Sequence, residues 1–316
     1  MKKWIDRCST THDHGLPKRD FKPSRLIRLA KYKMEVAQLY SPTSPVRFAA
    51  LSYRWGADSE SMTLGRNIVE RYGHLEISSL PKTLQDAIIV TRRLGLEYIW
   101  IDRICIVQDD PGDWTEQASL MAKIYASAHV VLSATATRDC SDGFLRQRAE
   151  PLALRYKRHD GEVLELQAIK IDSHSCDRRS LKTDYELFKR GWCFQERLLA
   201  RRIIHFLPNE ILFECQAELE CQCGTAGQGH IANNDTGDGQ GSRCLAKLQA
   251  AQKIEGLNFG WSWMALLWEY SKMKLTRGED SLPALSGLAA CMGHLKPGKY
   301  IAGLWEHDIA IQLGWR

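Results

Sequence analysis

The sequence predicts an α/β fold with a mainly parallel sheet and helices on both of its faces. Between residues 48 and 134, apolar runs typical of buried strands alternate with amphipathic segments typical of helices. The connections between these segments are short, and strand–helix–strand units with short connections require parallel strands. The composition is that of a globular chain, because 44% of the 316 residues are hydrophobic and 26% are charged. We therefore expect two domains or one large elaborated domain.

The N-terminal part supplies the first strands and the clearest helix. Residues 1–24 show no regular hydrophobic period and are expected to form an irregular lead-in. Short strands are predicted at 26–30 and 35–40, and the apolar run 48–53 predicts a third strand. A helix is predicted over 81–94, because a proline suits its first turn and a glycine follows its last apolar position.

The middle of the chain continues the alternation and then adds antiparallel elements. The apolar run 98–101 predicts a strand covered on both faces, followed by a helix over about 114–128 and a strand at 129–134. Alternating residues at 151–170 predict an antiparallel pair on the sheet edge or beside it. The remaining predicted elements are a helix that starts near Leu187 and strands at 202–207 and 211–215.

The chain is expected to divide into a core and an extension. The core covers residues 25–223, and a glycine-rich segment at 224–243 is expected to be a flexible loop. Residues 244–316 are rich in Leu, Ala and Trp and are expected to form a helical extension packed on the core.

Charge and hydropathy exclude several function classes. The 43 basic and 38 acidic residues give a net charge of +5 without a long basic run, so we expect no nucleic acid partner. No apolar run approaches the roughly 20 residues that a bilayer span requires, and the first residues are too polar for a signal peptide. We therefore expect a cytoplasmic protein whose cysteines are mostly reduced.

Four blocks of the sequence resemble the fungal heterokaryon-incompatibility (HET) domain. They are FAALSYRWG at 48–56; LPKTLQDAI at 80–88 with LGLEYIWIDRICIVQDD at 94–110; MAKIY at 121–125 with GFL at 143–145; and RGWCFQERLL at 190–199. Their order and spacing are similar to those of the family, and Arg103 departs from it where a small residue is usual. The resemblance implies a fungal allorecognition protein whose activation arrests or kills the cell.

HET domains are in turn similar at long range to TIR domains, which implies a TIR-like, flavodoxin-like sheet. Residues 48–58 look like the first TIR strand and its loop, and Trp192–Glu196 looks like the TIR Trp-x-x-x-Glu segment. In enzymatic TIR domains that glutamate cleaves NAD, so the resemblance implies that Glu196 is catalytic and that NAD or a related nucleotide is the substrate. No other cofactor is expected to be required.

The chemistry of Glu196 fits this role, because a carboxylate stabilises the positive charge that develops on ribose when its N-glycosidic bond breaks. The spacing of four residues places Trp192 and Glu196 on one helix face. An alternative is structural: Trp192 is part of the core, and Glu196 forms an ion pair with Arg190, Arg197 or Arg201.

Asp102 is the second candidate catalytic residue, since it follows the strand 98–101 at the edge where open α/β sheets bind ligands. Its alternative role is to cap the next turn or to bridge to Arg103. The candidate substrate-binding residues are Tyr53, Arg54, Trp55, Arg103 and Trp192, which offer aromatic faces and guanidinium groups. Alternatively, the residues at 53–55 only cover the sheet.

A metal site is expected to be absent. Cys215, Cys221, Cys223, His230 and Cys244 provide soft ligands, but their spacing is not that of a zinc knuckle, so we expect structural thiols. The rival to an enzyme is a non-enzymatic signalling module that acts by self-association or by recruiting an upstream fungal incompatibility partner. Convergence of Glu196, Asp102 and Tyr53 on one open cavity would favour the enzyme.

Overall fold

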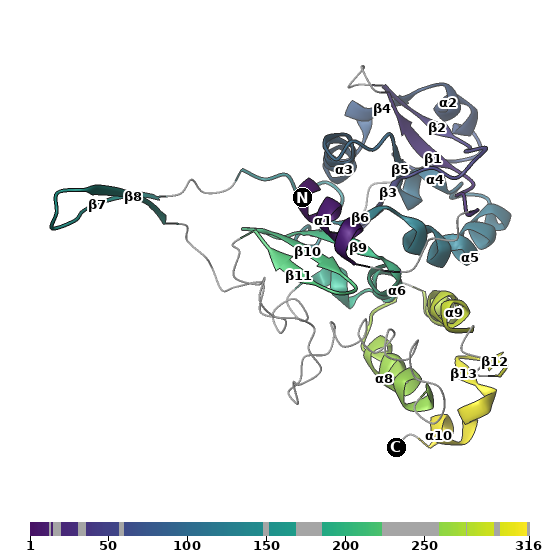
Figure 1. Ribbon diagram of the computed structural model, residues 1–316. Helices are drawn as coiled ribbons and strands as arrows, with labels where there is room; N and C mark the ends of the chain where they lie inside the picture. Colours follow the sequence, from purple (N-terminus) through teal and green to yellow (C-terminus); the bar gives the residue numbers. More distant parts are fainter. Residues whose placement is uncertain are drawn as a thin grey trace.

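The computed structural model describes residues 1–12, 14, 20–30, 36–56, 60–147, 152–168, 185–222, 259–275, 277–293 and 298–314. A nine-stranded sheet in the order β11-β10-β9-β6-β3-β5-β1-β2-β4 dominates this part of the chain (Figure 1). Its strands are β1 (Leu26–Leu29), β2 (Val36–Tyr40), β3 (Ala49–Ser52), β4 (Leu75–Glu76), β5 (Tyr98–Trp100), β6 (Val130–Ser133), β9 (Arg202–Phe206), β10 (Ile211–Cys215) and β11 (Leu219–Cys221).

The centre of the sheet is parallel and its two sides are antiparallel. The strands β9, β6, β3 and β5 pair in parallel, while β10 and β11 extend one side and β1, β2 and β4 extend the other in antiparallel pairs. The β3 strand is fully buried, as expected for a strand covered on both faces. The predicted α/β fold with antiparallel additions is confirmed.

Helices cover both faces of the sheet (Figure 1). They are α1 (Lys2–Thr11), α2 (Ile68–Gly73), α3 (Lys82–Arg93), α4 (Asp102–Cys105), α5 (Pro111–Ser127) and α6 (Gly191–Leu199). Short 3-10 helices are η1 (Ile77–Ser79), η2 (Glu186–Lys189), η3 (Gly278–Asp280) and η5 (Glu306–Asp308). Successive residues of β10 point to opposite faces of the sheet. Phe213 stacks on Trp4 of α1 on one face, and Glu214 pairs with Arg197 of α6 on the other.

The N-terminal segment corrects an expectation, because the supposedly irregular lead-in is helical over Lys2–Thr11. Ile5 and Cys8 of α1 are buried against the sheet, and Trp4 stacks on Phe213 at 6.1 Å between ring centroids. This apolar stripe spans only about one helical turn and is followed by Ser and Thr residues. The hydrophobic period was therefore too short to be distinguished from an irregular segment.

The sequence blocks 80–88 and 143–145 meet on α3. The buried carboxylate of Asp86 accepts hydrogen bonds from the backbone N–H groups of Phe144 and Leu145 at 2.8 and 2.9 Å. Gly143 has φ +68° and lies so close to Lys82 that a Cβ atom would collide with it. A glycine is therefore required where the two blocks touch.

The alternating segment after residue 151 forms the predicted antiparallel hairpin, with β7 (Leu152–Lys157) and β8 (Val163–Ala168), but not on the sheet edge or beside it as expected. It is a separate two-stranded sheet that projects away from the nine-stranded one (Figure 1). All six residues of β7 are exposed.

The C-terminal extension contains α8 (Phe259–Ser271), α9 (Ser281–Met292), β12 (Tyr300–Ile301), β13 (Leu304–Trp305) and α10 (Ile309–Leu313). Its core surrounds the fully buried Trp263, and it includes Ala122 of α5 and Leu198 of α6, so the extension packs on the helices of the sheet. The glycine-rich segment 224–243 lies outside the described residues. Within the described ranges, no helix combines the length and apolar character needed to cross a bilayer.

Candidate functional site

Two neighbouring parallel strands end beside each other and deliver polar side chains to one edge of the sheet. Tyr53 directly follows β3, and Asp102 follows β5 after one residue. The indole Nε1 of Trp55 donates a 2.6 Å hydrogen bond to Oδ2 of Asp102, and the backbone N–H of Arg103 donates a 2.7 Å bond to Oδ1. The Asp102 carboxylate is thus held at both oxygens. Burial raises its pKa, and the hydrogen bonds from Trp55 and Arg103 lower it in part.

Glu196 reaches the same place from α6, the helix that precedes β9. It is only 5% exposed, and its Oε2 has no hydrogen-bond partner among the described residues. Burial raises the pKa of Glu196 to about 7, the Ser52 hydroxyl and the Arg190 guanidinium lower it in part, and the Asp102 carboxylate raises it further. A buried carboxyl group that titrates near neutrality is characteristic of functional sites.

These groups line one cavity of about 560 Å³. Its wall includes Tyr53, Trp55, Asp102, Trp192 and Glu196, so five of the predicted residues converge on it. The other lining residues are Leu51, Ile106, Gln108, Asp109, Pro111, Trp114, Thr115, Ala118, Met121, Tyr125, Arg190, Arg277 and Asp280. The volume lies within the range of about 300–1,000 Å³ that small-molecule sites occupy.

Aromatic rings form much of this wall and are fixed by polar contacts. Trp192 packs edge-on against Trp114 at 6.5 Å between centroids, and its Nε1 donates a 3.1 Å hydrogen bond to Asp280. The Tyr53 hydroxyl, by contrast, is buried and has no partner among the described residues, and burial raises its pKa. The cavity therefore offers ring faces together with a hydroxyl and a carboxylate oxygen whose hydrogen-bonding capacity is unused.

Two predicted substrate-binding arginines lie elsewhere. Arg103 does not line the cavity, because its side chain is completely buried beneath it. Its guanidinium donates to the carbonyl of Trp55 at 2.9 Å and to Ser61 at 3.1 Å, and it lies 4.9 Å from the Trp55 ring centroid. Arg103 thus supports Trp55 and does not contact the cavity, which corrects the prediction.

Arg54 lines an adjoining cavity of about 420 Å³, which shares Trp55 and Arg190 with the first one. Its wall also contains Gly56, Glu186, Lys189, Lys274 and Leu275. The cavity wall has four basic residues and one carboxylate. That carboxylate, Glu186, pairs with Lys189 at 2.5 Å. The second cavity is therefore cationic and shares part of its wall with the aromatic one.

The structural alternative is not supported for Glu196 and is partly supported for Asp102. Arg197 pairs with Glu214, and Arg201 donates to the carbonyl of Ala126, so neither neutralises Glu196. Arg190 acts on Glu196 electrostatically while its guanidinium donates to the carbonyl of Tyr53 at 2.9 Å. Among the described residues, Glu196 therefore forms no ion pair with Arg190, Arg197 or Arg201, the partners that the structural alternative named. Asp102 does accept the Arg103 N–H in the first turn of α4, in addition to the Trp55 indole.

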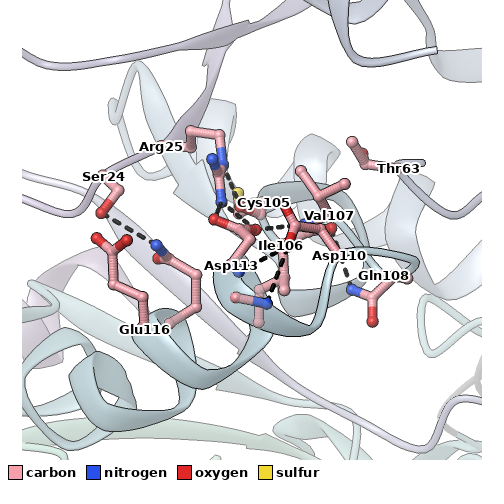
Figure 2. A network of polar contacts seen from close by, with 12 residues as sticks. Ser24, Arg25, Thr63, Cys105, Ile106, Val107, Gln108, Asp110, Asp113 and Glu116 are labelled. Atoms are coloured by element: carbon pink, nitrogen blue, oxygen red, sulfur yellow. Dashed lines mark hydrogen bonds and ion pairs between the residues drawn. The ribbon is translucent and has the colours of Figure 1, made fainter. Parts of the chain in front are cut away.

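A second polar network holds the segment between α4 and α5, which forms part of the cavity wall (Figure 2). Arg25, just before β1, donates to both carboxylate oxygens of Asp113 at 2.5 Å and to the carbonyl of Cys105 at 2.6 Å. Asp113 also accepts the backbone N–H of Val107 at 2.7 Å. One guanidinium nitrogen of Arg25 thus contacts both oxygens of Asp113, while its Nε holds the Cys105 carbonyl, so the side chain joins the two segments by charge-assisted hydrogen bonds.

Several lining residues were not predicted as site residues. Arg190 was considered only as an ion-pair partner of Glu196, and Trp114 and Tyr125 were placed on the buried side of a helix. Arg277 and Asp280 reach the cavity from the C-terminal extension, about 80 residues after α6. A single sequence contains no signal that joins segments so far apart.

The predicted cysteine cluster is only partly visible, because Cys223, His230 and Cys244 lie outside the described residues. Cys215 has a free thiol, as do Cys8, Cys105 and Cys193. Cys221 is disulfide-bonded, which corrects the expectation that its thiol is free.

One known protein family matches the middle of the chain. Residues 48–196 match the model of the family described as heterokaryon incompatibility protein (HET). A HET domain thus matches residues 48–196, slightly less than half of the chain. The match begins one residue before β3 and ends at Glu196, so it encloses Tyr53, Trp55, Asp102 and Trp192 of the cavity. No curated protein and no solved structure matches the chain. The HET domain supports a function related to heterokaryon incompatibility, and the similarity to TIR domains stays a prediction.

Proposed function

We propose that this HET domain is a cell-death effector of fungal incompatibility that hydrolyses the N-glycosidic bond of NAD or a related nucleotide. One observation carries the proposal: the buried carboxylate of Glu196, whose Oε2 has no hydrogen-bond partner among the described residues, lines the same cavity as Asp102 and Tyr53. Retaining a desolvated carboxylate oxygen without a partner lowers stability, and such a cost is usual where the group serves chemistry.

The reaction assigns a different task to each carboxylate. The bond between ribose C1′ and the nicotinamide nitrogen breaks, and its electron pair leaves with nicotinamide. The oxygen of a water molecule bonds to C1′, and the proton that this water loses is released to solvent. Glu196 in its ionised form stabilises the cationic ribosyl group in between. Asp102, held by Trp55 and Arg103, is oriented to accept a hydrogen bond from a ribose hydroxyl.

The two adjoining cavities suit the two halves of such a substrate. The aromatic cavity offers Trp55, Trp114 and Trp192 for stacking of a flat ring. The cationic cavity contains Arg54 and Lys274 as well as the shared Arg190, which suits phosphate groups. A dinucleotide spanning both would place its ribose near the shared wall.

The direct test is nicotinamide release from NAD by the purified full chain, compared with Glu196→Gln. We expect the variant to lose about 10²–10³-fold in kcat, because the substitution removes a charge that faces the developing cation. The matched control is Glu165→Gln on the projecting hairpin, whose side chain is 71% exposed and which should retain wild-type activity. Equal turnover by wild type and Glu196→Gln would show that Glu196 is not catalytic.

The cellular test measures viability and NAD content together after expression of the same variants. Wild type and Glu165→Gln should deplete NAD and kill, while Glu196→Gln should do neither. Killing with unchanged NAD would refute nucleotide cleavage and favour the non-enzymatic module.

The hairpin supports that second candidate, a module that acts by self-association. Its exposed apolar residues include Leu152, Tyr156 and Val163, at 64%, 54% and 54% exposure. A two-stranded hairpin with open edges can pair with the same hairpin of a second copy. Replacing Leu152 and Tyr156 with Lys should abolish concentration-dependent dimers in light scattering; unchanged dimers, or a monomeric wild type, would rule out this route.

A further inference from the structure

A cluster of soft ligands lies on the opposite face of the sheet from the cavity. It consists of Cys8 of α1, His12 at the end of α1, His14 and Cys215 of β10. Cys215 follows Glu214, whose side chain pairs with α6, so Cys215 points to the other face, where α1 packs. The cluster therefore has no part in the proposed cleavage site.

The four ligand atoms are close enough to share one ion, because each lies within 4.8 Å of every other. The Sγ of Cys8 is 3.0 Å from Nε2 of His14, and the Sγ of Cys215 is 3.5 Å from Nδ1 of His12. In a tetrahedral zinc site, with Zn–S about 2.3 Å and Zn–N about 2.0–2.1 Å, neighbouring ligand atoms are roughly 3.3–3.8 Å apart. The arrangement needs only small adjustments to surround an ion.

Local structure explains why these residues meet. Cys8 and His12 are four residues apart and lie on one face of α1. The chain leaves the helix with extended backbone at His12 (φ −116°, ψ 128°), which brings His14 back toward Cys8. Ion pairs of Arg7 with Glu218 and Glu220 hold α1 beside the β10–β11 hairpin.

The surroundings of the cluster also suit a metal ion. Glu218 lies 3.7 Å from Nε2 of His12, the ring nitrogen that does not face Cys215. A carboxylate behind a histidine is the usual support of a zinc ligand. The Nε of Arg202 donates to the Sγ of Cys8 at 3.2 Å, as backing groups do for a thiolate ligand. The charges of two thiolates and Glu218 balance those of a divalent ion and Arg202.

We infer that Cys8, His12, His14 and Cys215 form a tetrahedral zinc site that fastens α1 to the sheet. Two thiolates and two imidazoles favour Zn²⁺ over hard cations, and four protein ligands leave no open position, so the ion is structural. The inferred site replaces the expectation that no metal is bound. That expectation rested on the spacing of Cys215 to the cysteines and the histidine that follow it in the sequence. His12 and His14 had been placed in an irregular lead-in.

The test measures the metal content of the full chain purified from zinc-supplemented cells, with Zn²⁺ affinity from competition with a chelator. We expect about one zinc per chain in wild type and in the controls His74→Gln and Cys291→Ser. Glu218→Gln should lower the Zn²⁺ affinity about 10–100-fold, as is usual for residues that support a metal ligand. His14→Gln removes a ligand and should lower the Zn²⁺ affinity further. Replacing the zinc of wild type with Co²⁺ should give thiolate charge-transfer bands and the intense visible bands of tetrahedral cobalt.

Three results would overturn the inference. One is wild-type protein that neither contains zinc nor binds added Zn²⁺. Another is undiminished zinc in the double variant Cys8→Ser/Cys215→Ser. The third is a Cys8–Cys215 disulfide found by mass spectrometry of thiol-blocked wild type, since a disulfide cannot supply two thiolates. Wild type and His14→Gln decide the question even if the double variant does not fold.

Discussion

Trp55 and Asp102 join the ends of two parallel strands, because the indole Nε1 donates a 2.6 Å hydrogen bond to the Oδ2 of the carboxylate. Both oxygens of Asp102 are thereby occupied, whereas Oε2 of Glu196 in the same cavity has no partner among the described residues. Two carboxylates in different environments suit two different roles. Under the proposed function, Asp102 binds the substrate and Glu196 retains an oxygen for chemistry.

This relationship predicts the effect of Trp55→Phe. Phenylalanine keeps an aromatic ring but cannot donate to Asp102, and a hydrogen bond to a charged group contributes about 1.5–3 kcal/mol. We expect kcat/KM for NAD cleavage to fall about tenfold or more, with a higher apparent pKa for Asp102 because its hydrogen bond is lost. The control is Trp268→Phe on α8, which is 58% exposed. An unchanged pH–rate profile in Trp55→Phe would contradict this role.

The network around Arg25 predicts a stability effect. Arg25→Ala leaves the largely buried Asp113 without its ion-pair partner, and breaking such a pair costs about 3–5 kcal/mol. Arg155→Ala is the matched control, because its ion pair with Glu165 is 79% and 71% exposed and should contribute only about 0–1 kcal/mol. Urea unfolding measures both variants, and equal losses would show that the network does not hold the segment between α4 and α5.

The central sheet could be predicted from sequence because its signals are local. Residues 48–53 and 98–101 are unbroken apolar runs, and each leads to a helix with a clear hydrophobic stripe. Asp102 and Tyr53 were found for the same reason, since a polar residue at the carboxyl end of a buried strand has a predictable position. The parallel pairing of β3 with β5 then brings them together.

Contacts between distant segments could not be predicted. Cys8 and Cys215 are 207 positions apart, and nothing in either segment indicates the other. Arg103 was misassigned for a related reason: spacing placed it at the sheet edge, but the short helix α4 turns its side chain inward toward Ser61. The direction of a side chain in the first turn after a strand depends on packing that a single sequence does not specify.

The buried pair of Arg197 and Glu214 predicts an acid-sensitive contribution to stability. Arg197 donates twice to Glu214, and His205 donates from Nε2 at 2.8 Å while its Nδ1 lies 3.2 Å from the Thr135 hydroxyl. Although burial opposes ionisation, Arg197 and His205 lower the pKa of Glu214 to about 2 from 4.5. Glu214→Gln should therefore lower the unfolding free energy at neutral pH by about 3–5 kcal/mol.

The sign of the pH effect follows from that lowered pKa. The contribution of Glu214 is complete above its unfolded pKa of 4.5 and is lost as the pH falls toward about 2. The stability difference between wild type and Glu214→Gln should shrink by roughly 3 kcal/mol over this interval. Denaturant unfolding at a series of pH values measures it, and a difference independent of pH would show that the pair is not ionised.

For Glu196 we expect the opposite dependence of the unfolding free energy on pH. Burial raises its pKa from 4.5 to about 7, so the folded state holds a proton that the unfolded state has lost between these values. The unfolding free energy of wild type should therefore decrease by roughly 3 kcal/mol from this group as the pH rises from about 4.5 to above 7. Glu196→Gln cannot ionise and should lack this decrease.

The variant should thus match wild type near pH 4 and exceed its stability at pH 8, while its turnover of NAD is lost. Wild-type activity should rise as the pH increases through about 7, because only the ionised carboxylate stabilises a ribosyl cation. Unfolding and nicotinamide release measured on the same samples separate the two effects. A Glu196→Gln variant that is less stable than wild type at pH 8 would mean that the carboxylate has a hidden cationic partner, and Glu196 would then be structural.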